Sequence, residues 1–394
     1  MKRMAFYFLS FMILAACSAD PDARLHDQLH RIQSQFTPLI EKADRAERRA
    51  LRQRYHEELA KMADGIDPAR LRNASRLTYA GILMELERFP ESENILLPLV
   101  SLEETDLRIR ALQSLMLVGA RRGDAESLRE HYAALDAAMG GDMKAAAALL
   151  LEVGNRMRDT DLETALELID RGLAYPLPVE AEDSLYTAIH IRFVDGGLGN
   201  RERGVFLDRM AREYGERPRI KAQIEKKRGF LGFLGTVAPE LDTPGTWLNR
   251  DNPLSLKELR GRYVLVDFFA PWCPDCRNSL DGFQRLGEKL GDRLQTLLVT
   301  RIYGFYADED TPAVRGIGAD DELARLKTYL EKKQVKMPVF VAHDEQAHTR
   351  FNASAIPHYV LIAPDGTVAD LCMERVHGFF NRVEALVVGE QAGD

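Results

Sequence analysis

Two cysteines separated by two residues are the feature of this sequence most able to do chemistry. Cys273 and Cys276 lie in the stretch FFAPWCPDCRNSL, at a predicted strand-to-helix junction. Such a pair can exchange disulfides with another molecule, supply half of a metal site, or form an inert structural bridge. A bridge between residues three apart closes too small a loop to constrain the unfolded chain much, so the structural disulfide is poorly supported.

A metal site is also poorly supported. A structural zinc ion usually takes four ligands, and neither a second C-x-x-C nor an H-x-x-x-H segment lies near Cys273 in the sequence. A disulfide-stapled fold would use more than the four cysteines present and would spread them along the chain. We therefore expect no metal and no other cofactor, because the Cys273–Cys276 pair would itself carry the electrons.

Pro274 indicates how the pair would work. If a helix begins at Pro274, where proline fits well, Cys273 is the N-cap, and the free backbone N–H groups and the helix dipole stabilise an anion there. The pKa of Cys273 would then fall below the ordinary thiol value of about 8.5. Cys273 would attack a disulfide, and the more protected Cys276 would resolve the mixed disulfide. Asp275 opposes ionisation of Cys273 but complements the dipole, which leaves the redox potential open.

The elements that must position this pair lie in residues 226–394. Strands are expected in RYVLVDFFA, RLQTLLVT, MPVFVA, HYVLIA and GTVADLCM, and helices in CRNSLDGFQRLGEKL, DDELARLKTYLEKKQ and FFNRVEALVV. This order implies a parallel pair of strands extended by an antiparallel hairpin, whose turn would be APDG at residues 363–366. We predict an α/β domain.

Residues 17–225 follow a different pattern. Ala, Leu, Glu and Arg dominate, and apolar residues recur at spacings of three and four, which predicts consecutive helices. LMLVGARRGD at residues 115–124 is echoed by LLEVGNRMRD at residues 150–159, thirty-five positions later. That offset is close to the roughly 34 residues of tetratricopeptide (TPR) repeats. We predict an all-helical, repeat-like domain, with a non-repeating bundle as the alternative.

The first residues predict export. Lys2 and Arg3 precede a short apolar run, which is typical of a signal peptide covering residues 1–16. The ending LAAC resembles the lipobox of bacterial lipoproteins, in which Cys17 becomes the lipidated first residue. The resemblance implies a lipid anchor facing the periplasm, and Ser18 favours the outer membrane over the inner. The alternative is an ordinary signal peptide with an incidental cysteine.

The segment RYVLVDFFAPWCPDC resembles the signature of the thioredoxin superfamily. Its lead-in, GTVAPELDTPG followed by SLKELRG, is similar to the redoxin (AhpC/TSA-like) branch that includes the anchored TlpA-like thiol–disulfide oxidoreductases. The resemblance covers about the last two-fifths of the chain. It implies a thioredoxin-like α/β/α domain after the helical one, and a reductant closer to thioredoxin than to the disulfide-forming enzymes.

Further site residues follow from this resemblance. Asp267 matches the buried acid of thioredoxins, which accepts the proton of the resolving cysteine; burial in an apolar strand would raise its pKa. Pro357 matches the family's cis-proline, which implies that the Ile356 backbone pairs with an extended substrate. Trp272 and Pro274 complete the expected substrate-binding set. The alternatives are a satisfied polar residue at a strand edge for Asp267, an edge-strand start for Pro357 and core packing for Trp272.

Three features remain beside this set. Residues 301–321, RIYGFYADEDTPAVRGIGADD, form an insertion that could border the site and select partners, or be a surface elaboration. Cys372 is expected to be a small buried hydrophobe, with a regulatory thiol as the alternative. His358 could titrate near neutral pH, but a strand-end histidine is the simpler interpretation.

Together these patterns favour a lipid-anchored, extracytoplasmic thiol–disulfide oxidoreductase that reduces protein disulfides and is recharged by an upstream thiol donor. The alternatives are a thioredoxin-fold thiol peroxidase and a scaffold whose helical domain binds a protein partner. Peroxiredoxins carry a Thr three residues before the reactive cysteine, where this chain has Ala270. The formal charge of −8 argues against non-specific binding of nucleic acid, which needs a basic surface.

Overall fold

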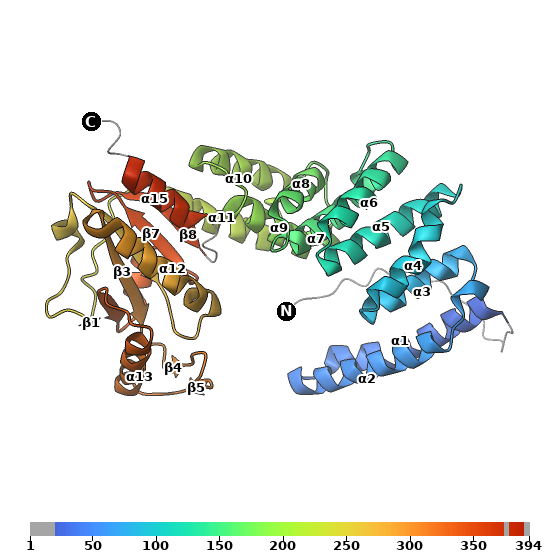
Figure 1. Ribbon diagram of the computed structural model, residues 1–394, viewed down its shortest axis with the longest axis horizontal. Coiled ribbons are helices and arrows are strands. Elements are labelled where there is room, and N and C mark those ends of the chain that lie inside the picture. Colours follow the sequence, from blue (N-terminus) through green and yellow to red (C-terminus); the bar gives the residue numbers. More distant parts are fainter. Residues whose placement is uncertain (1–19, 374–377, 390–394) are drawn as a thin grey trace. The chain divides into compact units, whose positions relative to one another are not determined.

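The computed structural model describes residues 20–373 and 378–389 (Figure 1). The predicted signal peptide, residues 1–16, and the predicted lipid site at Cys17 lie outside these ranges. By contacts the chain divides into two compact units, Met1–Arg192 and Phe193–Asp394. Among the described residues, no helix is long and apolar enough to cross a membrane.

The first unit is built from helices, as predicted. They are α1 (Pro21–Lys42), α2 (Arg45–Asp64), α3 (Asn73–Glu85), α4 (Phe89–Val100), α5 (Thr105–Arg122), α6 (Ala125–Ala138), α7 (Ala147–Met157), α8 (Leu162–Gly172) and α9 (Glu182–Val194), the last ending beyond the unit. Short 3₁₀ turns, η1 (Pro68–Arg70), η2 (Lys144–Ala146) and η3 (Val179–Ala181), connect some of them. Consecutive helices pack against each other, most closely α5 with α6 and α7 with α8.

The sequence echo has a physical cause in these two helix pairs. Gly119 of α5 faces α6, where a Cβ would lie 3.4 Å from the Cβ of Leu128. Gly154, thirty-five residues later in α7, faces α8, where a Cβ would lie 2.9 Å from the carbonyl oxygen of Ala165. The glycine in each Val-Gly pair therefore lets the next helix approach closely. The tetratricopeptide assignment stays a prediction.

The second unit contains a six-stranded sheet. Its strands are β1 (Gly245–Leu248), β2 (Tyr263–Phe268), β3 (Leu294–Arg301), β6 (Val339–Ala342), β7 (His358–Ile362) and β8 (Val368–Met373), in the order β1-β6-β3-β2-β7-β8. β3 is parallel to β2 and β6, whereas β7 is antiparallel to β2 and β8 is antiparallel to β7. The predicted hairpin is confirmed, because the N–H of Gly366 donates to the carbonyl of Ala363 (2.8 Å) between β7 and β8.

Two strand features were not predicted. β1 pairs antiparallel with β6 at the sheet edge. The insertion forms a two-stranded ribbon of β4 (Phe305–Tyr306) and β5 (Val314–Arg315). These strands are two to four residues long, too short for a period-2 pattern to be recognised.

Helices cover both faces of the sheet. The helices of this unit are α10 (Asn200–Tyr214), α11 (Pro218–Phe233), α12 (Pro274–Leu290), α13 (Ala319–Lys332), α14 (Gln346–Arg350) and α15 (Phe379–Gly389), with the 3₁₀ turns η4 (Leu256–Leu259) and η5 (Gly291–Arg293). Side chains alternate between the two faces along each strand. On one face, α12, α13 and α15 enclose a core that includes Leu265, Leu298 and Tyr359.

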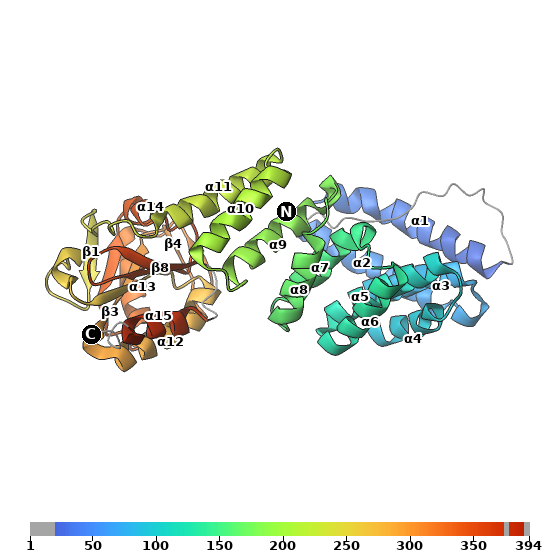
Figure 2. The same ribbon diagram turned by 90° about the horizontal axis from the view of Figure 1, so that it is seen from above.

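The opposite face carries an aromatic cluster. The ring of Phe268 contacts the rings of His358, His348 and Phe351, with centroids 5.0–5.7 Å apart. Phe230 of α11 packs against His358, with centroids 6.2 Å apart. In Figure 2 the sheet lies between α12 and α15 on one side and α11 and α14 on the other.

The change of composition after residue 225 falls within α11. The contacts divide the chain earlier, after Arg192.

Candidate active site

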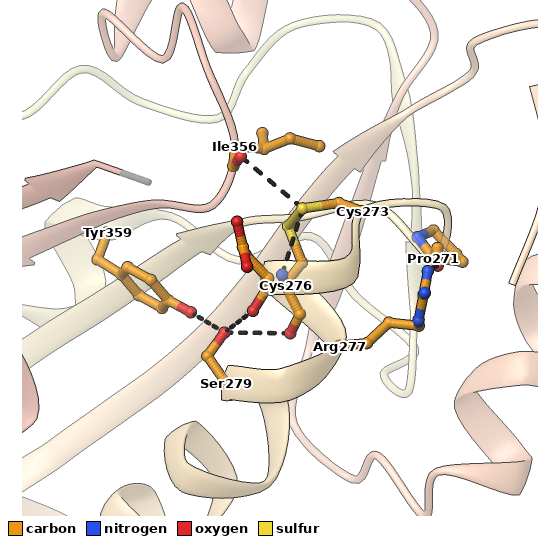
Figure 3. Close-up of a disulfide and its surroundings, with 8 residues drawn as sticks. Pro271, Cys273, Cys276, Arg277, Ser279, Ile356 and Tyr359 are labelled. Atoms are coloured by element: carbon orange, nitrogen blue, oxygen red, sulfur yellow. Dashed lines mark hydrogen bonds between the residues drawn. A yellow bond between two sulfur atoms is a disulfide. The ribbon is translucent and has the colours of Figure 1, made fainter. Parts of the chain in front are cut away.

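Cys273 is the N-cap of α12, as the sequence predicted. The helix begins at Pro274, and the Sγ of Cys273 accepts a hydrogen bond from the backbone N–H of Cys276 (3.2 Å) (Figure 3). The two cysteines form a disulfide with their Cα atoms 5.3 Å apart. In the reduced protein the same N–H would stabilise a thiolate on Cys273, because a charged acceptor makes a stronger hydrogen bond than a neutral one.

The two sulfurs differ in access to solvent. Cys273 retains 5% of its surface, whereas Cys276 is fully buried. Only Cys273 can therefore meet a disulfide from outside. Cys276 forms the disulfide with Cys273 on the side away from solvent, where it can resolve a mixed disulfide.

The loop before β7 faces Cys273. The Ile356–Pro357 peptide bond is cis, as the resemblance implied. The carbonyl oxygen of Ile356 lies 3.7 Å from the Sγ of Cys273 (Figure 3). Pro357 is buried and precedes β7, which lies between β2 and β8, so the alternative of an edge strand is wrong.

Asp267 is fully buried on β2. By geometry, neither of its carboxyl oxygens is hydrogen-bonded within the described part of the chain. Burial raises the pKa of Asp267 well above its ordinary value, and the nearby Tyr359 hydroxyl opposes that shift. β2 is an inner strand, so the alternative of a satisfied polar residue at a strand edge is wrong. A carboxyl group held protonated in this way can exchange a proton at a higher pH than an exposed one.

Tyr359 and Ser279 were not predicted as part of the site. Tyr359 lies directly opposite Asp267 across β2 and β7. Its hydroxyl donates to the Oγ of Ser279 (2.7 Å), one turn beyond Cys276 in α12 (Figure 3). Ser279 in turn donates to the carbonyl oxygens of Asp275 (2.9 Å) and Cys276 (3.1 Å). The pairing of β7 with β2 and the packing of α12 on the same face of the sheet bring these groups together.

The insertion borders the site. The ring of Trp272 meets the rings of Tyr303 and Phe305 edge-on, with centroids 5.3 and 6.1 Å apart. Trp272 also packs against the core of the unit, so core packing accounts for part of its role. Further along the insertion, a carboxylate oxygen of Glu309 lies 3.6 Å from the Nε of Arg277, the residue after Cys276.

Two remaining residues take structural positions. Cys372 on β8 is buried, and burial raises its pKa to about 12. Its thiol is therefore uncharged at neutral pH, which agrees with the predicted role as a small hydrophobic residue. His358 is fully buried at the start of β7, and burial lowers its pKa to about 3, so titration near neutral pH is wrong. Within residues 20–373 and 378–389, no cluster of His, Cys, Asp or Glu could hold a metal ion.

Known proteins are similar to the part of this chain that contains Cys273 and Cys276. The sequence model of the AhpC/TSA family matches residues 234–371. Those residues form a thioredoxin-like AhpC/TSA domain. A curated relative, the thioredoxin-like protein YneN of Bacillus subtilis, is 19% identical over 117 residues, which cover 30% of this chain and 59% of that protein's length.

Solved structures are similar to the thioredoxin-like domain as well. One is the thioredoxin domain of a thiol-disulfide oxidoreductase from Bacteroides vulgatus, with 20% identity, a TM-score of 0.31, and coverage of 39% of this chain and 97% of that one. Another is a thiol-disulfide isomerase from Corynebacterium glutamicum, with 21% identity, a TM-score of 0.29, and coverage of 40% and 97%.

Proposed function

We propose that this chain is a thiol–disulfide oxidoreductase that reduces disulfides in other proteins. The observation that carries the proposal is the position of Cys273: a sulfur at the start of α12, hydrogen-bonded by a backbone N–H, slightly exposed and bonded to a buried partner. That arrangement gives one sulfur that can attack and a second that can resolve. The match of residues 234–371 to the AhpC/TSA family supports the same class of chemistry.

The reaction balances in two exchanges. In the reduced protein, the Cys273 thiolate attacks one sulfur of the substrate disulfide; that S–S bond breaks, and the other substrate sulfur leaves as a thiolate that is protonated. The thiolate of Cys276 then attacks the Sγ of Cys273 and releases the second substrate sulfur. Asp267, in its ionised form, accepts the proton that Cys276 loses and returns it through solvent to one substrate thiolate. A proton from solvent reaches the other substrate thiolate, so the substrate gains two electrons and two protons in total. A thiol donor upstream would return the Cys273–Cys276 pair to its reduced form.

The substrate would lie between α12 and the Ile356–Pro357 loop. The Ile356 carbonyl faces the Sγ of Cys273 at 3.7 Å. A carbonyl oxygen has two lone pairs, so it can also accept from an N–H of an extended substrate, and such backbone pairing contributes affinity without requiring a particular sequence. Trp272 and the exposed Pro274 flank the sulfur on the helix side. Pro357 is buried, so it holds the loop, and direct contact falls to Ile356.

A trapping experiment tests this function. Cys276→Ser leaves Cys273 able to form a mixed disulfide but removes the resolving thiol, so substrate proteins should stay bound to Cys273 until a reductant is added. Cys273→Ser in the same cells is the matched control and should capture nothing. Equal recovery from both variants, or no capture by either, would contradict the reductase.

A thiol peroxidase is the alternative on the same fold. Ala270, fully buried three residues before Cys273, has no hydroxyl to orient a peroxide. We therefore expect the reduced protein to consume peroxide no faster than a free dithiol. Rapid consumption that Cys273→Ser abolishes would favour the peroxidase instead.

The sequence supports two further parts of the proposal. Lipidation of Cys17 would hold the protein in the bacterial envelope, facing the periplasm and favouring the outer membrane. Labelling with a radioactive fatty acid should mark the wild type and not Cys17→Ser. The helical unit would offer a binding surface to a protein partner. The full chain with both Cys273→Ser and Cys276→Ser should still be crosslinked to that partner, because the surface does not depend on the redox pair.

A further inference from the structure

The Tyr359 hydroxyl occupies a place between Asp267 and the helix turn that carries Cys276. Tyr359 is fully buried and lies directly opposite Asp267 in the antiparallel register of β2 and β7. Side chains of such a pair project from the same face of the sheet and lie within contact. The same hydroxyl is 2.7 Å from the Oγ of Ser279.

The direction of the hydrogen bonds around Ser279 is fixed by chemistry. The Oγ of Ser279 is 2.9 and 3.1 Å from the carbonyl oxygens of Asp275 and Cys276, and carbonyl oxygens only accept. Ser279 must therefore donate its single proton to those carbonyls, and Tyr359 must donate its own proton to Ser279. Toward Asp267, Tyr359 can then present only lone pairs.

This arrangement suits a protonated Asp267 and does not suit an ionised one. A carboxylic acid can donate to the Tyr359 oxygen, whereas a buried carboxylate needs a donor, and by geometry no group in the described part of the chain now supplies one. The Tyr359 hydroxyl is close enough to Asp267 to oppose the rise in pKa that burial causes. A turn of the Tyr359 O–H bond away from Ser279 would give the carboxylate its donor.

We propose, on the basis of the function proposed above, that Tyr359 is a positioning residue whose hydroxyl turns from Ser279 to Asp267 when Asp267 loses its proton. Ser279 is the competing acceptor. Because Ser279 is bound to the carbonyl of Cys276, the turn links the protonation of Asp267 to the helix turn that carries the resolving cysteine. Tyr359 thus holds Asp267 ready to take a proton and to release it again.

The surroundings contain few other groups that could act in this way. Besides Asp267, the buried thiol of Cys372 lies opposite Tyr359 on β8. Cys276 of α12 shares the same core but is held in the disulfide. α15 brings the rings of Phe379 and Phe380 to Tyr359, with centroids 5.7 and 5.4 Å away. β3 places Leu298 beside Asp267. The Arg382 guanidinium of α15 is paired with Asp370 (3.1 Å).

Infrared spectroscopy of the oxidised protein tests the proposal directly. The carboxyl stretch of Asp267, assigned by its loss in Asp267→Asn, reports the protonation of that group while Cys273 and Cys276 cannot titrate. Tyr359→Phe removes the donor for the carboxylate and should move the midpoint up by about one pH unit. Ser279→Ala removes the competing acceptor and should move the midpoint down by about half a unit.

Tyr329→Phe is the matched control. Tyr329 is buried in the same core on α13, and by geometry its hydroxyl has no hydrogen-bond partner within the described residues. This variant should leave the midpoint unchanged. Opposite shifts in Tyr359→Phe and Ser279→Ala support the proposal, and an absent shift or shifts in one direction overturn it.

The outcome is separable from that of the proposed function. The infrared midpoint is read from the oxidised protein without any substrate. If the wild type reduces protein disulfides but Tyr359→Phe shows no shift, the role of Tyr359 fails and the reductase stands. If the midpoints shift as expected while no substrate is trapped on Cys273, the reductase fails and the role of Tyr359 toward Asp267 stands.

Discussion

The backbone N–H of Cys276 donates to the Sγ of Cys273 across the first turn of α12, at 3.2 Å. The resolving residue therefore helps to hold the charge of the attacking sulfur. Cys276 performs this role through its backbone, so a substitution of its side chain leaves the hydrogen bond in place. This is the physical reason why Cys276→Ser should still form mixed disulfides.

Asp267→Asn should change stability in a pH-dependent direction. Burial raises the pKa of Asp267, so the folded state binds a proton that the unfolded state gives up at about pH 3.9. The unfolding free energy of the wild type therefore falls as pH rises from there to the folded pKa, by about 1.4 kcal/mol per unit, and then levels off. Asparagine does not ionise. The unfolding free energy of the variant minus that of the wild type should therefore be larger at pH 8 than at pH 4.

Denaturant unfolding of the oxidised protein measures this difference. Both tryptophans, Trp247 and Trp272, lie in the second unit, so their fluorescence follows that unit. Asp281→Asn, an exposed change on α12, is the control and should show no such pH dependence. A penalty for Asp267→Asn that is the same at both pH values would show that Asp267 is not held protonated.

Acid should destabilise the second unit through two histidines. Burial lowers the pKa of His348 to about 4 and that of His358 to about 3, whereas in the unfolded chain histidine titrates near 6.5. Between about pH 6.5 and 4 only the unfolded state takes up these protons. Each histidine therefore lowers the unfolding free energy by about 1.4 kcal/mol per pH unit as the pH falls.

His358→Phe isolates this effect. The His358 ring is flanked by the rings of Phe230 and Phe268, so phenylalanine keeps aromatic packing and cannot be protonated. The stability of the variant relative to the wild type should grow as the pH falls from 6.5 to 4, measured by tryptophan fluorescence in denaturant. A difference that stays constant with pH would contradict the assignment of His358 as a buried neutral group.

The ribbon of β4 and β5 should select for large substrates. The ring of Phe305 contacts that of Trp272, the residue before Cys273. A protein substrate bound at Cys273 would contact Phe305, whereas a small disulfide could react without that contact. Phe305→Ala should lower kcat/KM for protein disulfides about tenfold, as expected for loss of an aromatic contact at an interface. The rate with oxidised glutathione should hardly change.

Pro312→Ala supplies the comparison for that experiment. Pro312 is exposed in the loop between β4 and β5 and should leave both rates unchanged. An equal loss of Phe305→Ala activity toward protein and small disulfides would mean that Phe305 only supports the position of Trp272. Substrate selection by the ribbon would then be wrong.

Local pattern was enough to predict part of the site. The C-x-x-C pair followed by a helix-forming run placed Cys273 at the N-cap, because the Pro274 ring fits the first helical position. Asp267 was chosen because its position matches the buried acid of thioredoxins, and its place in an apolar strand predicted the raised pKa. The cis bond at Pro357 and the role of Ile356 came from resemblance to a family and not from their residue types.

The missed residues depend on tertiary register. Tyr359 is an ordinary strand tyrosine by type, and Ser279 an ordinary helix serine. Their roles appear only when β7 pairs with β2 and α12 lies across the same face. Similarly, α11 belongs to the helical pattern of the first half of the chain, yet its Phe230 packs on the sheet through His358. Composition cannot report such contacts.

The rate of alkylation of reduced Cys273 against pH tests the central claim most directly. In Cys276→Ser, the hydrogen bond from the backbone of residue 276 remains, and Cys273 is the only thiol of the pair. We predict a midpoint clearly below about 8.5, the ordinary thiol value. Cys372, which is buried and has a pKa of about 12, should not react in the folded protein. A midpoint at or above about 8.5, or a Cys273 that resists alkylation at every pH, would contradict the account.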